Sequence, residues 1–258
     1  MNKEHALKIF KNYTANYDST NVRISLKIAH TYRVADLAER IAGDVLHEQQ
    51  DCAGFAWLLG LLHDIGRFEQ FTRYGTFKDI LSVDHAELGA DILFHEGLFD
   101  KFISGEESCE DFQTIRAVAE TAVRLHNKLT IPSNLDLQTR IYTTILRDAD
   151  KIDIFRVLTE PPYDRRDLKN LPVRDEVMRY VKGHRCVPRQ ARANNLEVLI
   201  AQCCMAFELE YPESRAIVAE QGYLKKLLDQ DSELLTIVKT EIMKAWGNEN
   251  INCVNKSL

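Results

Sequence analysis

The sequence of 258 residues has no long hydrophobic run and few residues of the kind that form tight turns. Its longest apolar run covers the eight residues 55–62, whereas a membrane-spanning helix needs roughly 20. Eleven glycines and six prolines are few for this length, which argues against an all-β fold with many turns. The N-terminal residues mix charges and lead into no apolar stretch of signal-peptide length. We therefore expect a cytoplasmic protein that binds no membrane.

Paired cysteine motifs are also missing. None of the six cysteines stands in a Cys-x-x-Cys arrangement, and Cys203 and Cys204 are sequence neighbours inside an apolar stretch. A zinc site built from cysteines is therefore not expected, because such sites need ligands at defined spacings. The thiols are predicted to be reduced, as in most cytosolic proteins.

The overall charge does not favour a long nucleic acid as partner. The formal net charge is −6, and polyanion binding is usually carried by a basic surface. Residues 140–192 nevertheless hold 13 Lys or Arg against 8 Asp or Glu. This stretch is either an ordinary solvated surface or the entrance to a site that attracts a small anionic substrate. The sequence leaves both interpretations open.

Hydrophobic periodicity indicates helices along almost the whole chain. Apolar residues recur at helical spacing through a segment of about 25 residues that contains Ile24, Ile28, Val34 and Ile41. Residues 55–62 are apolar all round, as a helix in the centre of a bundle is. Gly66 is predicted to stop that helix, and residues 67–83 are predicted to form a loop. Further helices are expected at 84–95, 112–127, 137–158, 175–182, 191–210, 221–228 and 232–246.

The fold class predicted from this pattern is all-α, a helical bundle with additional C-terminal helices. No internal repeat or low-complexity linker divides the sequence. We therefore expect one domain over residues 1–258, with a core at residues 17–160 and a C-terminal helical elaboration at residues 161–258.

Histidines and aspartates fall at several apolar helices, where an ionised side chain is costly unless a partner compensates it. Imidazole and carboxylate are common ligands of divalent cations, and helical bundles build metal sites from inward-facing residues of different helices. The other histidines, at positions 5, 47, 95 and 184, are interpreted as structural or surface residues. The candidate metal ligands are His30, His63, Asp64, His85, His126 and Asp150.

The ordered set His30, His63-Asp64 and Asp150 resembles the signature of the HD-domain superfamily of metal-dependent phosphohydrolases. His85 and His126 match the extra ligands of members that hold two metals. The surrounding sequence is similar to a bacterial subgroup, and the resemblance covers roughly residues 17–160. It implies an HD-domain helical fold and an enzyme with two divalent metal ions, whose identity among Mn, Fe, Mg, Co, Ni and Zn it leaves open.

In such a site the resemblance implies that Asp64 bridges the two cations. His30, His63 and Asp150 would complete the coordination of one ion, and His85 and His126 would complete that of the other. Asp148 competes with Asp150 for the last position, because two residues two apart on a helix cannot both face one site. We choose Asp150, which stands in the Ala-Asp-Lys step typical of the family.

Two basic residues are candidates for the substrate. Arg67 follows Asp64 by three residues and is predicted to bind a phosphate oxygen, since guanidinium suits two-point contacts with phosphate. The alternative for Arg67 is an ion pair with Asp64 or Glu69. Lys151, adjacent to a candidate ligand, is a second possible substrate contact.

The predicted function is hydrolysis of a small phosphomonoester or phosphodiester, with a nucleotide-like substrate as first guess, by a metal-activated water. Asp64 and Arg67 are the predicted catalytic residues. The sequence after His126 lacks the Gly-Tyr-Pro of the branch that degrades cyclic di-GMP. Two alternatives stay open: an HD-type di-iron oxygenase, and a metal-stabilised sensor or binding module without turnover. The oligomeric state cannot be predicted.

Overall fold

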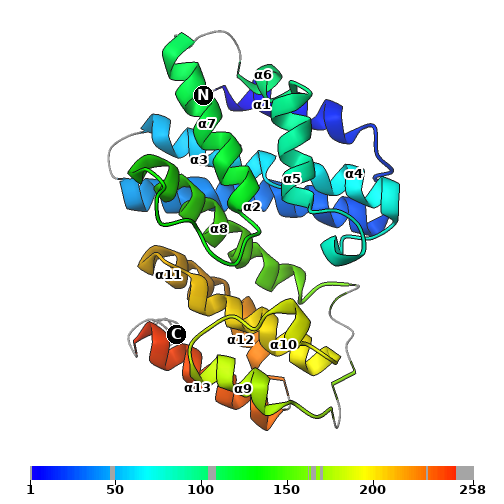
Figure 1. Cartoon of the computed structure of the whole chain (residues 1–258), viewed down its shortest axis with the longest axis vertical. Coiled ribbons are helices and arrows are strands. Elements are labelled where there is room, and N and C mark those ends of the chain that lie inside the picture. The colour runs from blue at the N-terminus through cyan, green and yellow to red at the C-terminus, as the bar shows by residue number, and fades with distance from the viewer. Residues whose placement is uncertain are drawn as a thin grey trace, which may run out of the picture. The chain divides into compact units, whose positions relative to one another are not determined.

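The computed structural model describes residues 2–46, 50–103, 109–161, 163, 167–168, 171–230 and 232–247. These residues form helices and contain no β-strand, which confirms the all-α fold class (Figure 1). None of their helices has both the length and the apolar character of a membrane-spanning segment. The chain divides into two compact units, Met1–Asp150 and Lys151–Leu258. The division falls ten residues before the one predicted, and the single domain stays a prediction.

The first unit is built around a long helix and a shorter, fully apolar one, α2 (Val22–Leu46) and α3 (Gln50–Leu62), which pack closely together. Leu58, Leu59, Leu61 and Leu62 on α3 are completely buried. Gly60 makes this packing possible, because a Cβ there would lie only 2.5 Å from the Cα of Ala35 on α2. A buried helix without a polar face thus forms the centre of the unit.

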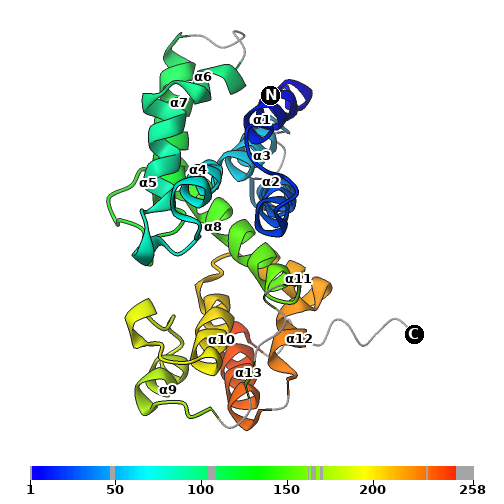
Figure 2. The same ribbon diagram turned by 90° about the vertical axis from the view of Figure 1, so that its right-hand side faces the viewer.

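The remaining helices of the first unit surround this pair. Helix α1 (Lys3–Thr14) packs on α3, and α7 (Cys109–Leu125) contacts both α3 and α5 (Figures 1 and 2). A π-helical turn continues α5 and is followed by the short α6. The remaining elements are α4 (Ile65–Tyr74), a 3-10 turn at Asp79–Leu81, α5 (His85–Ala90), the π-helical turn Asp91–His95, α6 (Leu98–Phe102) and the part of α8 (Leu137–Val157) up to Asp150.

The loop predicted at residues 67–83 is wrong over its first half, because Ile65–Tyr74 forms helix α4. Phe68 is fully buried there, against Phe10, Tyr13 and Tyr17. Gly66 does not end a helix either: it lies in the first turn of α4, where a Cβ would fall on the carbonyl oxygen of His85. It is therefore required for close packing, and Gly75, with a φ of 64°, ends α4.

The second unit contains short helices packed on α13 (Glu233–Trp246). Trp246 at its end donates a hydrogen bond of 2.9 Å to the carbonyl oxygen of Ala206. Helix 175–182 was predicted with these bounds, but the prediction missed Pro212–Gln221, whose proline stands in the first turn. The other elements are α9 (Asp175–Lys182), a 3-10 turn at Arg189–Ala191, α10 (Asn195–Cys203), a second 3-10 turn at Cys204–Glu208, α11 (Pro212–Gln221) and α12 (Tyr223–Leu228).

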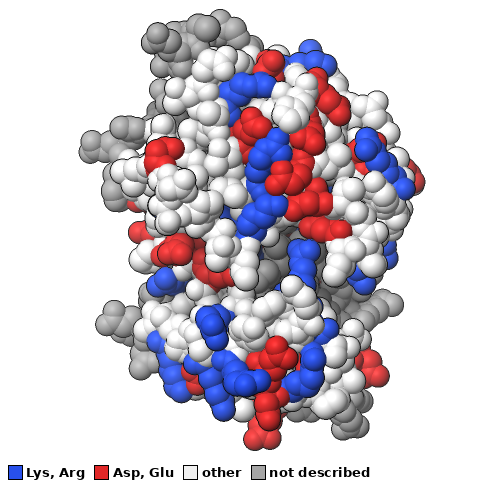
Figure 3. Space-filling view, in the orientation of Figure 1, with Lys and Arg blue, Asp and Glu red and all other residues white. Residues whose placement is uncertain are grey.

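Many basic side chains of residues 140–192 have partners inside their own unit. Arg147 donates to the backbone carbonyl oxygens of Leu125 and Lys128. Arg156 forms a two-point ion pair with Asp153, with both distances 2.7 Å, and Arg174 does the same with the buried Glu197. On the face drawn in Figure 3, acidic and basic side chains of the first unit lie interleaved, whereas basic side chains predominate on the second unit. The interpretation of the stretch as a basic entrance stays a prediction.

Candidate metal centre

Five of the six predicted ligands lie at the buried centre of the first unit, each less than 5% exposed, and Asp150 lies at its edge. They come from different elements. His30 stands in α2, His63 and Asp64 form the turn between α3 and α4, and His85 begins α5. His126 follows the end of α7, and Asp150 stands in α8. The structure therefore brings the whole predicted set together.

The turn after α3 places two of these groups by local structure. The apolar α3 carries the chain to the middle of the unit and ends at Leu62, so His63 and Asp64 lie in the interior and not at the surface.

His85 is positioned by the start of α5. The Asp84 carboxylate caps this helix by accepting a hydrogen bond from the backbone amide of Ala86. This cap fixes the first residue of the helix, His85.

The first group of ligand atoms surrounds one oxygen of Asp64. The Oδ2 atom lies 3.6 Å from His30 Nε2 and 3.4 Å from His63 Nε2. Asp150 Oδ1 closes the group at 3.1 Å from His30 Nε2 and 3.6 Å from His63 Nε2. Asp148 is buried, but it is Asp150 that stands beside the two rings.

The second group surrounds the other oxygen of the same carboxylate. Asp64 Oδ1 lies 3.5 Å from His85 Nε2 and 3.9 Å from His126 Nε2, and these two nitrogens are 3.0 Å apart. The Asp64 carboxylate thus presents one oxygen to each pair of histidines, as a bridging ligand must.

Three of the histidine rings hydrogen-bond through Nδ1 to groups outside the two sets of candidate ligands. His63 Nδ1 donates to the carbonyl oxygen of Gly60 and His126 Nδ1 to that of Val123, both at 2.7 Å. His85 Nδ1 donates to the carboxylate of Asp79 at 2.9 Å. Because carbonyls and carboxylates only accept, the proton of each neutral ring sits on Nδ1 and the Nε2 lone pair faces the cluster.

This arrangement fits a divalent cation better than an internal hydrogen bond. Among the described residues, the buried His63 Nε2 has no hydrogen-bond partner. His85 Nε2 and His126 Nε2 lie 3.0 Å apart, and in neutral rings protonated on Nδ1 both atoms carry lone pairs. These lone pairs repel each other unless a positive charge lies between them. Two nitrogens that each bind one ion at about 2.1 Å, with an N–ion–N angle of about 90°, are themselves about 3.0 Å apart. The donor set of imidazole and carboxylate suits such an ion.

The electrostatics of the cluster are those of a cation site. Burial raises the pKa of Asp64, but Lys27 and His63 outweigh it and hold that pKa well below its usual range. Burial lowers the pKa of His63, but the Asp64 and Asp150 carboxylates raise it to about 9. Burial, together with positive charge on neighbouring rings, lowers the pKa of His126 to about 3. Without a metal, a proton on His63 therefore balances part of the negative charge.

Sequence reasoning missed two residues of the site. Asp79 lies in the segment that was predicted as a loop, and only the tertiary structure brings it to His85. Lys27 stands one turn before His30, and its Nζ lies 2.5 Å from Asp64 Oδ2. The helical spacing of Lys27 and His30, three residues apart, was the one signal in the sequence that could have found it.

The two predicted substrate contacts lie in different surroundings. Arg67 Nε lies 3.4 Å from Asp64 Oδ1, and Nη1 donates to Asp79, to Gln70 and to the Phe77 carbonyl oxygen. The predicted ion pair with Asp64 is thus present, and Glu69 pairs with Arg73 instead. Lys151 is buried in the second unit, with its Nζ 3.4 Å from Glu208. Its role as a substrate contact stays a prediction.

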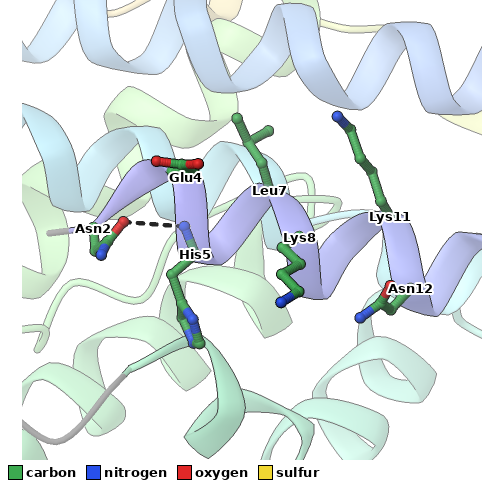
Figure 4. A pocket seen from close by; sticks show the side chains of 7 residues that line it. All are labelled: Asn2, Glu4, His5, Leu7, Lys8, Lys11 and Asn12. Atoms are coloured by element: carbon green, nitrogen blue, oxygen red, sulfur yellow. Dashed lines mark hydrogen bonds between the residues drawn. The ribbon is translucent and has the colours of Figure 1, made fainter.

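The histidines interpreted as structural have partners outside the cluster. His5 hydrogen-bonds the carbonyl oxygen of Lys101, His95 pairs with Asp91, and His184 pairs with Glu241. His47 lies outside the described residues. His5 also lines a surface depression along α1, which contains no predicted ligand (Figure 4). The depression is lined by Asn2, Glu4, His5, Leu7, Lys8, Lys11 and Asn12.

The fold and the site together define a class: an all-helical protein with a buried His/Asp cluster of the kind that holds divalent metal. Residues 28–154 match the HD domain family. The chain therefore contains an HD domain, and members of the HD-domain family are mostly metal-dependent hydrolases. Comparison with curated proteins and with solved structures gives no match.

Proposed function

We propose that this chain is a phosphohydrolase that holds two divalent cations and cleaves a small phosphomonoester or phosphodiester, with nucleotides as the first substrates to test. The observation that supports it best is the orientation of Asp64. One of its oxygens faces His30 and His63, and the other faces His85 and His126. A single buried carboxylate with two separate sets of partners is suited to bridge two ions.

The candidate ligands would position the cations for this reaction. Bound divalent cations supply an acidified water as nucleophile and neutralise charge on the phosphoryl oxygens. The Nδ1 hydrogen bonds of His63, His85 and His126 keep their Nε2 lone pairs directed at the cluster. No nucleophilic side chain is required, so the protein contributes position and charge.

Two cationic side chains flank the bridging carboxylate. Arg67 and Lys27 lie against opposite oxygens of Asp64, and each is mostly shielded from solvent. Within the described residues Arg67 uses Nη1 and Nε, and we assign its Nη2 to a substrate oxygen. A small anionic, phosphate-bearing substrate is the partner that such charges favour.

The test is a metal analysis of the purified full-length protein, followed by a phosphate-release screen across nucleotides and sugar phosphates. Phosphodiesters are scored by coupling to a phosphatase. We expect about two ions per chain and release that depends on Mn, Mg, Co or Ni. Asp64→Asn serves as the inactive control. Oxygen consumption with bound iron would instead support the di-iron oxygenase, and metal without any turnover would support a binding module.

A further inference from the structure

Asp79 lies on the 3-10 turn between α4 and α5, outside the predicted ligand set. Its two carboxylate oxygens lie 3.0 Å and 2.9 Å from His85 Nδ1. Because a carboxylate only accepts, His85 carries its proton on Nδ1 and leaves Nε2 unprotonated toward Asp64 and His126. The contact therefore determines which nitrogen of His85 can bind an ion.

The Asp79 side chain is itself held in place. Its Oδ1 accepts from Arg67 Nη1 and from Gln70 Nε2, both at 2.9 Å. Gln70 is completely buried and also donates to the Ser82 hydroxyl and the Val83 carbonyl oxygen. Asp79 is thus anchored to α4 and to the segment that leads into α5.

These contacts close a ring of four side chains. Asp64 Oδ1 lies against His85 Nε2, His85 Nδ1 donates to Asp79, Asp79 accepts from Arg67, and Arg67 Nε returns to Asp64 Oδ1 at 3.4 Å. The orientation of His85 is thereby linked to the carboxylate that both groups share. A change at Asp79 is transmitted to the second group of ligands.

His85 differs in this respect from the two rings beside it. His63 and His126 donate to backbone carbonyls, which no substitution removes. Only the contact of His85, among these three, depends on a side chain. Asp79 is therefore a position at which the second group can be altered while the contacts of the first group are left in place.

We propose that Asp79 is the positioning residue for the second metal ion: it holds His85 in the Nδ1–H tautomer, so that Nε2 is a ligand. This inference rests on the proposed two-metal function. Partners of this kind orient metal-bound histidines generally, and their loss typically costs about 10- to 100-fold in metal affinity.

Asp79→Asn keeps the shape of the side chain and replaces one of its two acceptor oxygens by a donor. Arg67 and Gln70 both donate to Oδ1, so they retain the amide oxygen there and place the NH2 group at the position of Oδ2. The NH2 group opposes a proton on His85 Nδ1, but the amide oxygen, 3.0 Å from Nδ1, still accepts one. Asp79→Asn is therefore a partial change.

Asp79→Ala is the sharper variant, because it removes both acceptors. Among the described residues, the NH2 group of Asn127, which Asp84 holds 3.5 Å from His85 Nδ1, then remains beside that nitrogen and can only donate, so the His85 proton should move to Nε2, the nitrogen that the ion needs. We expect Mn²⁺ titration of the chelator-treated protein to show a second-site affinity about 10- to 100-fold lower in Asp79→Ala, with a smaller loss in Asp79→Asn and the first site within about threefold. A residue that only supports the local fold would lower the affinities of both sites and leave the His85 tautomer unchanged. Ser82→Ala is the matched control, because it removes another Gln70 contact without touching His85.

Nitrogen NMR of the metal-free protein gives a second readout that needs no activity. We expect the Nδ1–H form of His85 in the wild type and the Nε2–H form in Asp79→Ala, where His85 can donate to His126 Nε2. An unchanged tautomer, or equal second-site affinities in wild type and Asp79→Ala, would overturn the inference. A wild type that binds only one ion would refute the proposed function instead, and the tautomers would still test the role of Asp79.

Discussion

The Nε2 atoms of His85 and His126 lie 3.0 Å apart although both rings already use Nδ1 as a donor. Two neutral imidazoles in this state direct lone pairs at each other. Such a pair is unfavourable in a closed protein interior unless a cation or a proton lies between the nitrogens. The contact therefore supports the proposed second ion, independently of any sequence likeness.

Asp64→Ala should remove both ions and all turnover. Among the described residues, this side chain is the one carboxylate that lies against both groups of histidines, so its loss leaves each set of ligands incomplete. Metal content by elemental analysis and phosphate release should fall together. Asp91→Ala, which removes an exposed carboxylate paired with His95 and Arg124, is the control expected to keep both. Full activity of Asp64→Ala would refute the site assignment.

Metal binding should release close to one proton near neutral pH. The pKa of His63 is about 9 in the metal-free protein, so its ring is protonated at pH 7 and must lose the Nε2 proton to bind an ion. Metal affinity at the first group should rise about tenfold per pH unit from pH 7 to about 9 and then level off. Calorimetric titrations in two buffers of different protonation enthalpy measure the proton directly. Affinity independent of pH over this range would contradict the prediction.

Arg67→Ala should lower kcat/KM by about 10- to 1000-fold while metal content stays near wild type, as expected for one lost charge-assisted contact. Arg67→Lys should recover only part of the rate, because an ammonium cannot contact Asp64, Asp79 and a phosphate in the planar geometry of guanidinium.

Arg73→Ala is the matched control for Arg67, since it removes a half-exposed arginine six residues later on the same helix. Its rate should equal that of the wild type. If Arg67→Ala lost metal and melting temperature in step with activity, Arg67 would be a structural residue. If Arg67→Ala changed neither kcat/KM nor metal content, Arg67 would be dispensable.

Gly66→Ala should destabilise the protein and weaken the second ion. A Cβ there would fall on the His85 carbonyl oxygen and lie 2.5 Å from the Gly89 nitrogen, so α5 must shift. Overpacking of this kind costs about 1–3 kcal/mol. Gly43→Ala is the control: a Cβ there meets nothing within 4 Å, and alanine in a helix should stabilise by about 0.5–1 kcal/mol. Equal melting temperatures for the two variants would contradict the packing argument.

The sequence by itself determined the fold class and the candidate ligands. Helical periodicity is a local property of the chain, and it located most helices within a few residues. Histidines and aspartates at apolar helices could be recognised because an ionised group is costly there. The assignment of Asp150 rather than Asp148 followed from the family resemblance, and the structure places Asp150 beside His30. Its function as a ligand stays a prediction.

Only the tertiary structure decided what lies around those ligands. Helix α4 does have apolar residues at helical spacing, Ile65, Phe68 and Phe71, and the prediction of a loop overlooked them. No pattern in residues 67–83, however, shows that Asp79 contacts His85. Hydrogen bonds between segments depend on packing of distant parts of the chain. For the same reason, the sequence could not show that Lys151 pairs with Glu208, 57 positions later, or that Asp64 presents one oxygen to each pair of histidines. Helix formation is settled within a few turns of chain, whereas the direction of a buried side chain is settled by every element packed around it.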